Sequence, residues 1–180
     1  MARLFRRDHF LMSFASIAYP ADKSGRYDLL LAQLRALTDG VAHPLANLAN
    51  AAALLWQGLP EINWCGFYLM DGGALLLGPF CGLPACIRIP LGRGVCGTAA
   101  QKDEIQCVHD VHAFPGHIAC DGASNAEIVI PIHFEDRVIG VLDIDSPTIG
   151  RFDETDQEKL SALIRHLEAC CDFSHTSYTL

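Results

Sequence analysis

The chain has 180 residues, of which 51% are hydrophobic and 19% are charged, and its formal net charge is -8. This length and composition predict one globular domain and exclude a disordered chain. The acidic balance argues against a nucleic-acid partner, whose phosphates attract basic surfaces, and no apolar run reaches the roughly 18 residues of a membrane span.

Residues 1–21 are expected to form an N-terminal extension outside the domain. Basic residues precede an apolar run at 10–19, as they do in a secretory signal peptide. Asp8 and Ser13 interrupt the pattern, however, and no small-residue cleavage site follows cleanly. We therefore expect a cytoplasmic protein, and Met12 is an alternative start.

Helical periodicity appears near both ends of the chain, and strand patterns lie between them. Apolar residues recur at helical spacing in 28–37 and 43–59, and Thr155 with Glu158 predicts a capping box for a helix that runs to Cys170. Alternating and β-branched residues predict six strands, with Gly, Pro and Asp at the breaks, at 62–70, 73–80, 86–90, 104–108, 127–134 and 137–145. The pattern indicates an α+β domain, residues 22–173, with a central antiparallel sheet flanked by helices and a tail at 174–180.

The connection between the last two strands sets their register. A loop of residues 135–137 places Ile128 opposite Ile144 and Phe134 opposite Val138, which gives one continuous apolar face. A turn of only two residues would break that face. The sequence therefore predicts the three-residue loop.

The opposite face of the same hairpin carries three acids. Glu127 is placed across from Asp145, with Asp143 one step along the strand. Like charges on neighbouring strand positions repel, so the three groups are either screened by water at a sheet end or line a pocket for a cation or a protonatable ligand. In a pocket, burial and repulsion would hold one carboxylic acid neutral and able to donate a proton.

Eight cysteines are many for a chain of this size, and most are expected to be small core residues in reduced form. Cys120 lies in "GHIACD", where it is filler, a metal ligand or a nucleophile. No CxxC pair occurs, and the step from His109 to His112 has no matching cysteine pair, so we expect no metal site.

Several stretches in order resemble the free methionine-(R)-sulfoxide reductases, single-domain enzymes with the GAF fold. The resemblance covers about residues 47–168 and rests on "INWCGFYLM", "LLLGPF", "CIRIPLGRGVCGTA", "DVHAFPGHIACD", "SNAEIVIPI", "VIGVLDIDS" and "GRFDETD". "GVLDID" alone would indicate only a GAF domain, a fold that mostly serves as a small-molecule sensor. A non-catalytic GAF-domain sensor is therefore the alternative reading, but such a sensor would not require a cysteine at position 120.

The resemblance implies roles for particular residues. Cys120 matches the nucleophile, Cys86 the resolving thiol and Cys96 a further redox-linked thiol. The implied substrate-binding residues are Trp64, Tyr68, Glu127, Asp143 and Asp145. Cys81, only five residues before Cys86, competes for the resolving role.

The implied reaction reduces free L-methionine-(R)-sulfoxide to L-methionine and protects against oxidative stress. The Cys120 thiolate attacks sulfur while Glu127 and Asp145 supply the proton, which leaves Cys120 as a sulfenic acid. Cys86 then forms a disulfide, which thioredoxin reduces with electrons from thioredoxin reductase and NADPH. Asp143 is expected to bind the substrate ammonium. No cofactor is expected to be bound, and a homodimer is an open alternative to a monomer.

Overall fold

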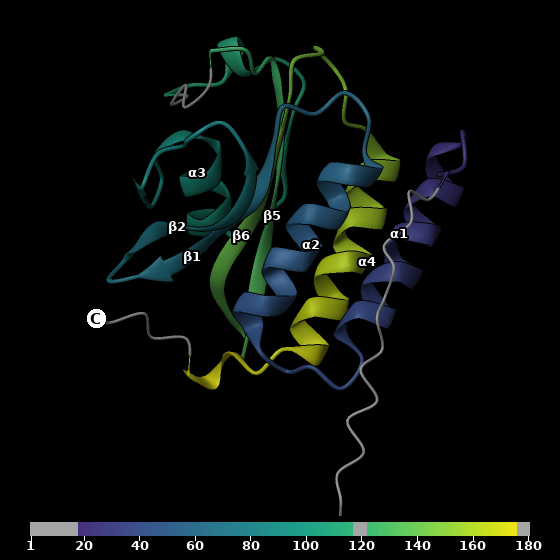
Figure 1. The fold of residues 1–180 in the computed structure, drawn as a ribbon. Coiled ribbons are helices and arrows are strands. Elements are labelled where there is room, and N and C mark those ends of the chain that lie inside the picture. The colour runs from purple at the N-terminus through teal and green to yellow at the C-terminus, as the bar shows by residue number, and fades with distance from the viewer. Residues whose placement is uncertain (1–17, 117–121, 176–180) are drawn as a thin grey trace, which may run out of the picture.

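The computed structural model describes residues 18–116 and 122–175, and within them a curled antiparallel sheet carries helices on both faces (Figure 1). The described strands lie in the order β3-β2-β1-β6-β5-β4. They are β1 (Trp64–Asp71), β2 (Ala74–Gly82), β3 (Arg88–Pro90), β4 (Gln106–Val108), β5 (Ala126–Phe134) and β6 (Arg137–Ser146). The α-helices are α1 (Lys23–Thr38), α2 (Pro44–Gly58), α3 (Gly94–Lys102) and α4 (Glu154–Cys170), and two short 3-10 helices cover Val111–Ala113 and Phe173–His175. The predicted α+β architecture is confirmed.

The sheet separates two apolar cores. On one face, α2 packs on β1 and β2, α4 packs on β5, and α1 lies against both helices on their outer side (Figure 1). On the other face, the shorter α3 covers β5 and β6. None of the described helices is long and apolar enough to cross a membrane.

The β5–β6 hairpin has the predicted pairing at its open end but a different turn. Ile128 lies opposite Ile144, as expected. The turn consists of Glu135 and Asp136 alone, with φ angles of 50° and 58°. Two residues at positive φ form the type of tight turn whose twist matches that of paired strands. The predicted three-residue loop is therefore wrong.

A bulge in β6 reconciles the short turn with the apolar pattern. Phe134 faces Arg137 rather than Val138, and the register shifts between Ile132 and His133. The bulge takes up one extra residue of β6. Side chains farther from the turn therefore have the same partners, and face the same side of the sheet, as a three-residue loop would have given them.

The start of α4 also differs from the prediction. Asp153 is the capping residue, and its carboxylate accepts hydrogen bonds from the backbone N–H groups of Thr155 and Asp156. The Asp156 carboxylate accepts in turn from the backbone N–H of Asp153, at 2.9 Å, which completes a capping box. The predicted box of Thr155 and Glu158 is wrong because aspartates also cap helices, and here both aspartates bind Lys23 of α1.

The periodicity of the sequence did not predict α3. This helix has nine residues and contains glycines, which are poor helix formers. Its Gly97 is required by packing, because a side-chain carbon there would overlap the backbone oxygen of Pro90. The helix ends at Lys102, because Asp103 follows it in the left-handed conformation.

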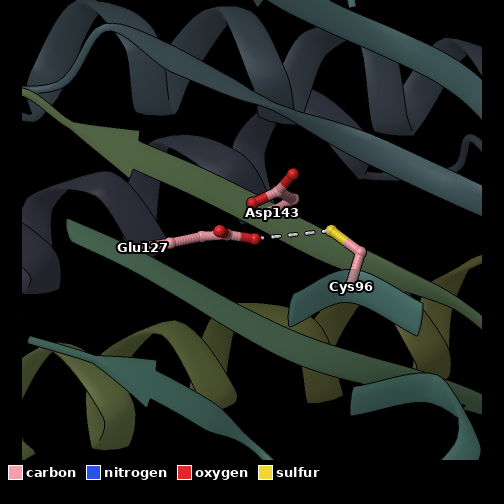
Figure 2. A group of neighbouring side chains, drawn as sticks. All are labelled: Cys96, Glu127 and Asp143. Carbon is pink, nitrogen blue, oxygen red and sulfur yellow. Dashed lines mark hydrogen bonds between the residues drawn. The ribbon is translucent and has the colours of Figure 1, made fainter. Parts of the chain in front are cut away.

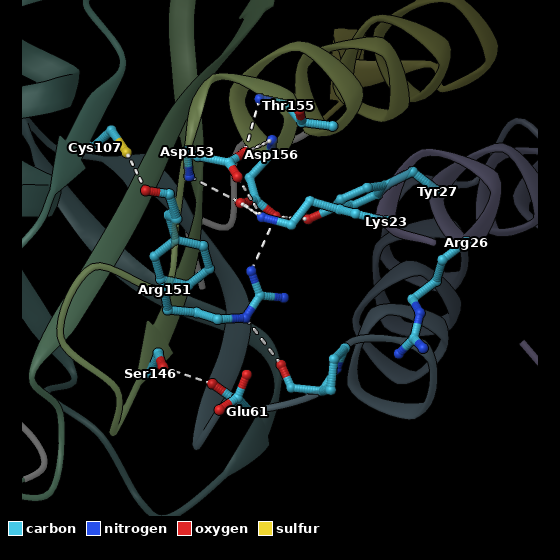
Figure 3. A network of polar contacts seen from close by, with 12 residues as sticks. Lys23, Arg26, Tyr27, Glu61, Cys107, Ser146, Arg151, Asp153, Thr155 and Asp156 are labelled. Atoms are coloured by element: carbon cyan, nitrogen blue, oxygen red, sulfur yellow. Dashed lines mark hydrogen bonds and ion pairs between the residues drawn. The ribbon is translucent and has the colours of Figure 1, made fainter. Parts of the chain in front are cut away.

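A buried carboxylate joins α1 to α4 (Figure 3). Asp156 is fully buried and accepts a hydrogen bond of 2.7 Å from the hydroxyl of Tyr27. It also pairs with Lys23 at 2.6 Å and with Arg151 at 3.1 Å, and the Arg151 side chain is itself only 6% exposed. These contacts satisfy the charge that burial would otherwise penalise.

We predict that Asp156→Ala lowers the free energy of unfolding by about 3–5 kcal/mol, because it leaves the buried Arg151 guanidinium without its partner. The measurement is urea unfolding followed by circular dichroism. The matched control is Asp28→Ala, which removes the exposed partner of Lys159 and should change stability little. Equal losses in the two variants would show that the buried network does not hold the helices together.

Candidate functional site

A pocket lies between the sheet and α3, on the face opposite the three larger helices. Six side chains predicted from the sequence line it: Trp64, Tyr68, Cys96, Glu127, Asp143 and Asp145. They come from β1, α3, β5 and β6, and the strand residues share one face because side chains alternate along each strand. The pocket is narrow, with room for little more than small groups between these side chains.

Two stacked aromatic rings of β1 form one wall of the pocket. Trp64 and Tyr68 are almost fully buried, and their ring centroids lie 5.8 Å apart. The indole N–H of Trp64 donates to the backbone oxygen of Leu83, and the Tyr68 hydroxyl donates to that of Cys86, each at 3.1 Å. The aromatic wall therefore holds the segment that carries Cys86. This half-buried cysteine is disulfide-bonded.

A second part of the pocket wall is an acidic cluster with a thiol (Figure 2). Cys96 of α3 donates to Glu127 of β5, with 3.7 Å between its sulfur and the carboxyl oxygen Oε1. Asp143 of β6 lies beside them, and each of the three side chains offers one atom within 4.8 Å of the other two. Glu127 and Asp143 are each only 6% exposed, and Asp145 is half-buried opposite Glu127. The acids are therefore not a solvated sheet end.

Burial gives the two buried acids of the pocket different pKa values. Desolvation, followed by the charges of Asp143 and Asp145, raises the pKa of Glu127 well above its ordinary value. Desolvation raises the pKa of Asp143 to about 6, while hydrogen bonds from Cys96 and Glu127 counteract part of that effect. Glu127 therefore favours the neutral acid, whereas Asp143 is mostly a carboxylate above pH 6.

Burial acts on the thiol of Cys96 in the same direction. Desolvation, together with the negative charges of Asp143 and Glu127, raises its pKa well above the ordinary value. Cys96 is therefore a protonated hydrogen-bond donor at neutral pH and not a thiolate. Cys96 therefore differs from an activated nucleophile, which is an exposed cysteine with a lowered pKa.

The predicted nucleophile, Cys120, lies outside the described residues. Ser124, four residues further along the chain, lines the pocket and accepts a hydrogen bond of 3.0 Å from the Asn63 side chain. Ser124 is thus held at the pocket. Four residues span at most roughly 14 Å.

Cys81 is placed unfavourably for the resolving role. It pairs directly with Cys65 across β1 and β2, and cross-strand partners point to the same face. Cys65 is fully buried in the core on the helix side of the sheet. The side chain of Cys81 therefore points away from the pocket, whereas Cys86 packs against the apolar cluster on the pocket side.

Arg93 and the start of α3 line the pocket as well, and sequence reasoning missed both. Gly92 and Gly94, which flank Arg93, have φ angles of 73° and 62° and mark a tight turn into the helix. In the sequence, these two glycines were the signal that could have predicted the turn. The unpaired N–H groups at a helix start and a guanidinium together suit a carboxylate or another anion.

Comparison with known proteins finds a family model and relatives that match most of the chain. Residues 30–170 match the family model described as "GAF domain". The chain is 51% identical to the free methionine-R-sulfoxide reductase of Escherichia coli, over 82% of this chain and 89% of that protein. It is 43% identical to the enzyme of the same name from Saccharomyces cerevisiae, over 80% of this chain and 84% of that protein.

A solved structure also resembles this one closely. It is the free methionine-R-sulfoxide reductase of Neisseria meningitidis in complex with its substrate, which superposes with a TM-score of 0.81. The two sequences are 44% identical, and the match covers 85% of this chain and 93% of the other.

We predict that Glu127→Gln and Asp143→Asn each raise the free energy of unfolding at pH 8, by about 1–3 kcal/mol. Both acids have a pKa that is higher in the folded chain than in the unfolded one. Their contribution to stability is therefore complete below about pH 4 and is lost as the pH rises through the folded values. The amides have no such loss.

The measurement is urea unfolding of each variant and the parent protein between pH 5 and pH 8. Glu104→Gln, which changes an exposed acid outside the pocket, is the control and should follow the parent. A pocket variant that is destabilised equally at every pH would contradict the assignment of a desolvation cost to these acids.

Proposed function

This chain belongs to the free methionine-R-sulfoxide reductases of the GAF-domain family, and on that basis we propose that it reduces free L-methionine-(R)-sulfoxide to L-methionine. The observation that carries the proposal is the pair of enclosed acids with separated pKa values. One favours the neutral acid, and the other is mostly ionised at neutral pH. Reduction of a sulfoxide that carries an ammonium group needs a neutral acid to protonate the oxygen and a carboxylate to bind the ammonium.

The ionised acid fits the substrate's amino group. Asp143 is buried, and its Oδ1 has no hydrogen-bond partner among the described residues. An ammonium bound there would satisfy that oxygen and compensate its charge. The substrate carboxylate would be bound at the start of α3 and by Arg93, or by backbone N–H groups of the loop that holds Cys120.

The methyl-sulfoxide group would then lie against Trp64 and Tyr68, since an aromatic ring is a favourable neighbour for sulfur. The Cys120 thiolate attacks this sulfur, and the oxygen must be protonated to leave. Glu127, neutral because of its raised pKa, is the proton donor, and Asp145 on the paired strand polarises the S–O bond with it. The hydroxyl then passes to the Cys120 sulfur as the sulfur–sulfur bond of the adduct breaks, which releases methionine and leaves Cys120, oxidised by two electrons, as a sulfenic acid.

Cys86 resolves the sulfenic acid. Its thiol displaces the hydroxyl of Cys120 sulfenic acid as water and forms a disulfide, which a thioredoxin-type dithiol reduces by exchange. The disulfide-bonded state of Cys86 and its attachment to Tyr68 support this role. Cys96 supports the reaction by its hydrogen bond to Glu127, and it is a reserve thiol for disulfide exchange.

The setting of the reaction follows from its electron source. Thioredoxin, supplied by thioredoxin reductase and NADPH, is the proposed partner, and no cofactor is needed in the protein itself. The cytoplasm maintains these reductants, so it is the proposed location. The proposed functional unit is residues 22–173, as a monomer or a homodimer.

We predict that the purified protein consumes NADPH steadily when free methionine sulfoxide, thioredoxin and thioredoxin reductase are present. Cys86→Ser should release about one methionine per chain and then stall, because the sulfenic acid is not converted to a disulfide. Cys120→Ser should release none, since a hydroxyl is a poor nucleophile for sulfur. Rapid-quench measurement of methionine per chain separates the two outcomes.

Cys81→Ser is the matched control for Cys86→Ser, because its side chain lies on the other face of the sheet, and it should turn over normally. A methionine-sulfoxide peptide tests the pocket, since peptide bonds remove the charges that Asp143 and the carboxylate donors bind. Steady turnover by Cys86→Ser would transfer the resolving role to another cysteine. Equal rates on the peptide would overturn the enclosed pocket.

We predict that kcat/KM falls as pH rises through the upper pKa of the acid cluster, even though more Cys120 thiolate forms there. Glu127 donates a proton only while it is protonated, and its raised pKa extends that range upward. Glu127→Gln should cost about 2–4 kcal/mol of transition-state stabilisation and should lose this alkaline limb.

Asp145→Asn should cost a similar amount, and the double variant should cost clearly less than the sum, because the two acids serve one proton transfer. The experiment measures kcat/KM of all four proteins across pH, with folding checked by circular dichroism. Strict additivity, or activity within twofold of the parent in either single variant, would place proton delivery elsewhere.

A further inference from the structure

The cluster that faces the pocket has the composition of a metal site. Cys96, Glu127 and Asp143 each offer one ligand atom, a sulfur and two carboxyl oxygens, and these atoms lie within 4.8 Å of one another (Figure 2). All three side chains are at least nine-tenths buried. They come from α3, β5 and β6, so their positions are set by helix and sheet packing and not by a flexible loop.

A separate observation points to a positively charged ligand at this place. The Oδ1 atom of Asp143 is buried in the pocket wall and has no hydrogen-bond partner among the described residues. A buried carboxylate oxygen without a donor is costly, and the cost is removed by a cation that binds it. Arg93 also lines the pocket, but no hydrogen bond or ion pair joins it to Asp143 in the described part of the chain.

The donor set and its spacing indicate the class of cation. In a tetrahedral zinc site, Zn–S and Zn–O distances near 2.3 and 2.0 Å put the sulfur and the oxygen ~3.5 Å apart. The Cys96 sulfur and the Glu127 oxygen are 3.7 Å apart here, so a small adjustment closes the site. Sulfur is an unsuitable ligand for Mg²⁺ or Ca²⁺ and a good one for Zn²⁺.

We propose that Cys96, Glu127 and Asp143 bind a borderline-soft divalent cation, Zn²⁺ or one of similar chemistry, which then blocks the pocket to organic ligands. The cation replaces the protons of the Cys96 thiol and of the carboxyl groups, and these protons pass to solvent. Asp145, which lines the same pocket, or a water completes the coordination. The sequence shows no metal motif because the ligands are separated by 31 and 16 residues, positions 96, 127 and 143, with no repeated short spacing.

Titration with Co²⁺ tests the metal site directly. The protein is used in its disulfide form, so that Cys86 offers no thiolate. We expect one Co²⁺ per chain and a near-ultraviolet absorption band from a thiolate ligand, which stoichiometric Zn²⁺ abolishes and millimolar Mg²⁺ does not. Cys96→Ser should lose the band, and Asp143→Asn should weaken binding by about tenfold or more.

Cys170→Ser is the matched control. Cys170 and Cys171 are neighbours with their sulfurs 3.9 Å apart, and this pair of thiols could also attract the metal. The control should keep the band and the affinity of the parent protein. Unchanged binding in folded Cys96→Ser, displacement by Mg²⁺ as effective as by Zn²⁺, or absence of a saturable site would each overturn the proposal.

Competition tests whether the cation blocks the pocket, and this part rests on the proposed function. Free methionine sulfoxide should raise the apparent dissociation constant for Co²⁺ in the disulfide form. A cation that binds as predicted but does not compete would retain the metal site and overturn the blocking of the pocket. A protein that binds Co²⁺ but reduces no methionine sulfoxide would overturn the proposed function alone.

Discussion

The pairing of β5 with β6 is the constraint on which the remaining structure depends. Because side chains alternate along a strand, this register sends Ile128 and Ile144 into the core beneath α2 and α4 and sends Glu127 and Asp143 into the pocket beneath α3. A slip of one residue would exchange the two sets. The tight turn and the bulge together maintain the register, and the pocket exists only while they do.

The protein buries acids in two places and treats them in opposite ways. Asp156 is surrounded by Lys23, Arg151 and a tyrosine hydroxyl, so its charge is compensated and it serves as a structural joint. Glu127 and Asp143 are buried against each other and against a thiol, and Asp143 Oδ1 has no hydrogen-bond partner among the described residues. The first arrangement stabilises the fold, whereas in the second a bound cation would compensate the buried carboxylate charge.

Burial of the pocket acids affects both their protonation and the stability of the folded chain. The raised pKa of Glu127 favours its neutral, proton-donating form, whereas Asp143 is mostly ionised at neutral pH. The burial that raises both pKa values lowers the stability of the folded chain there. An ammonium group and a divalent cation are two solutions to the same electrostatic problem. Selection between the two would have to come from the remaining lining of the pocket, the aromatic pair of β1 and the start of α3.

Local patterns in the sequence determined which residues share a face. Alternation placed Glu127, Asp143 and Asp145 together, the spacing of Trp64 and Tyr68 put both on one side of β1, and helical periodicity located α1, α2 and α4. Only the tertiary structure decided what covers each face. It brings Cys96 of α3 to Glu127, turns Cys81 away from the pocket and joins Asp156 to Lys23, because contacts between distant segments depend on packing and electrostatics that no short-range repeat encodes.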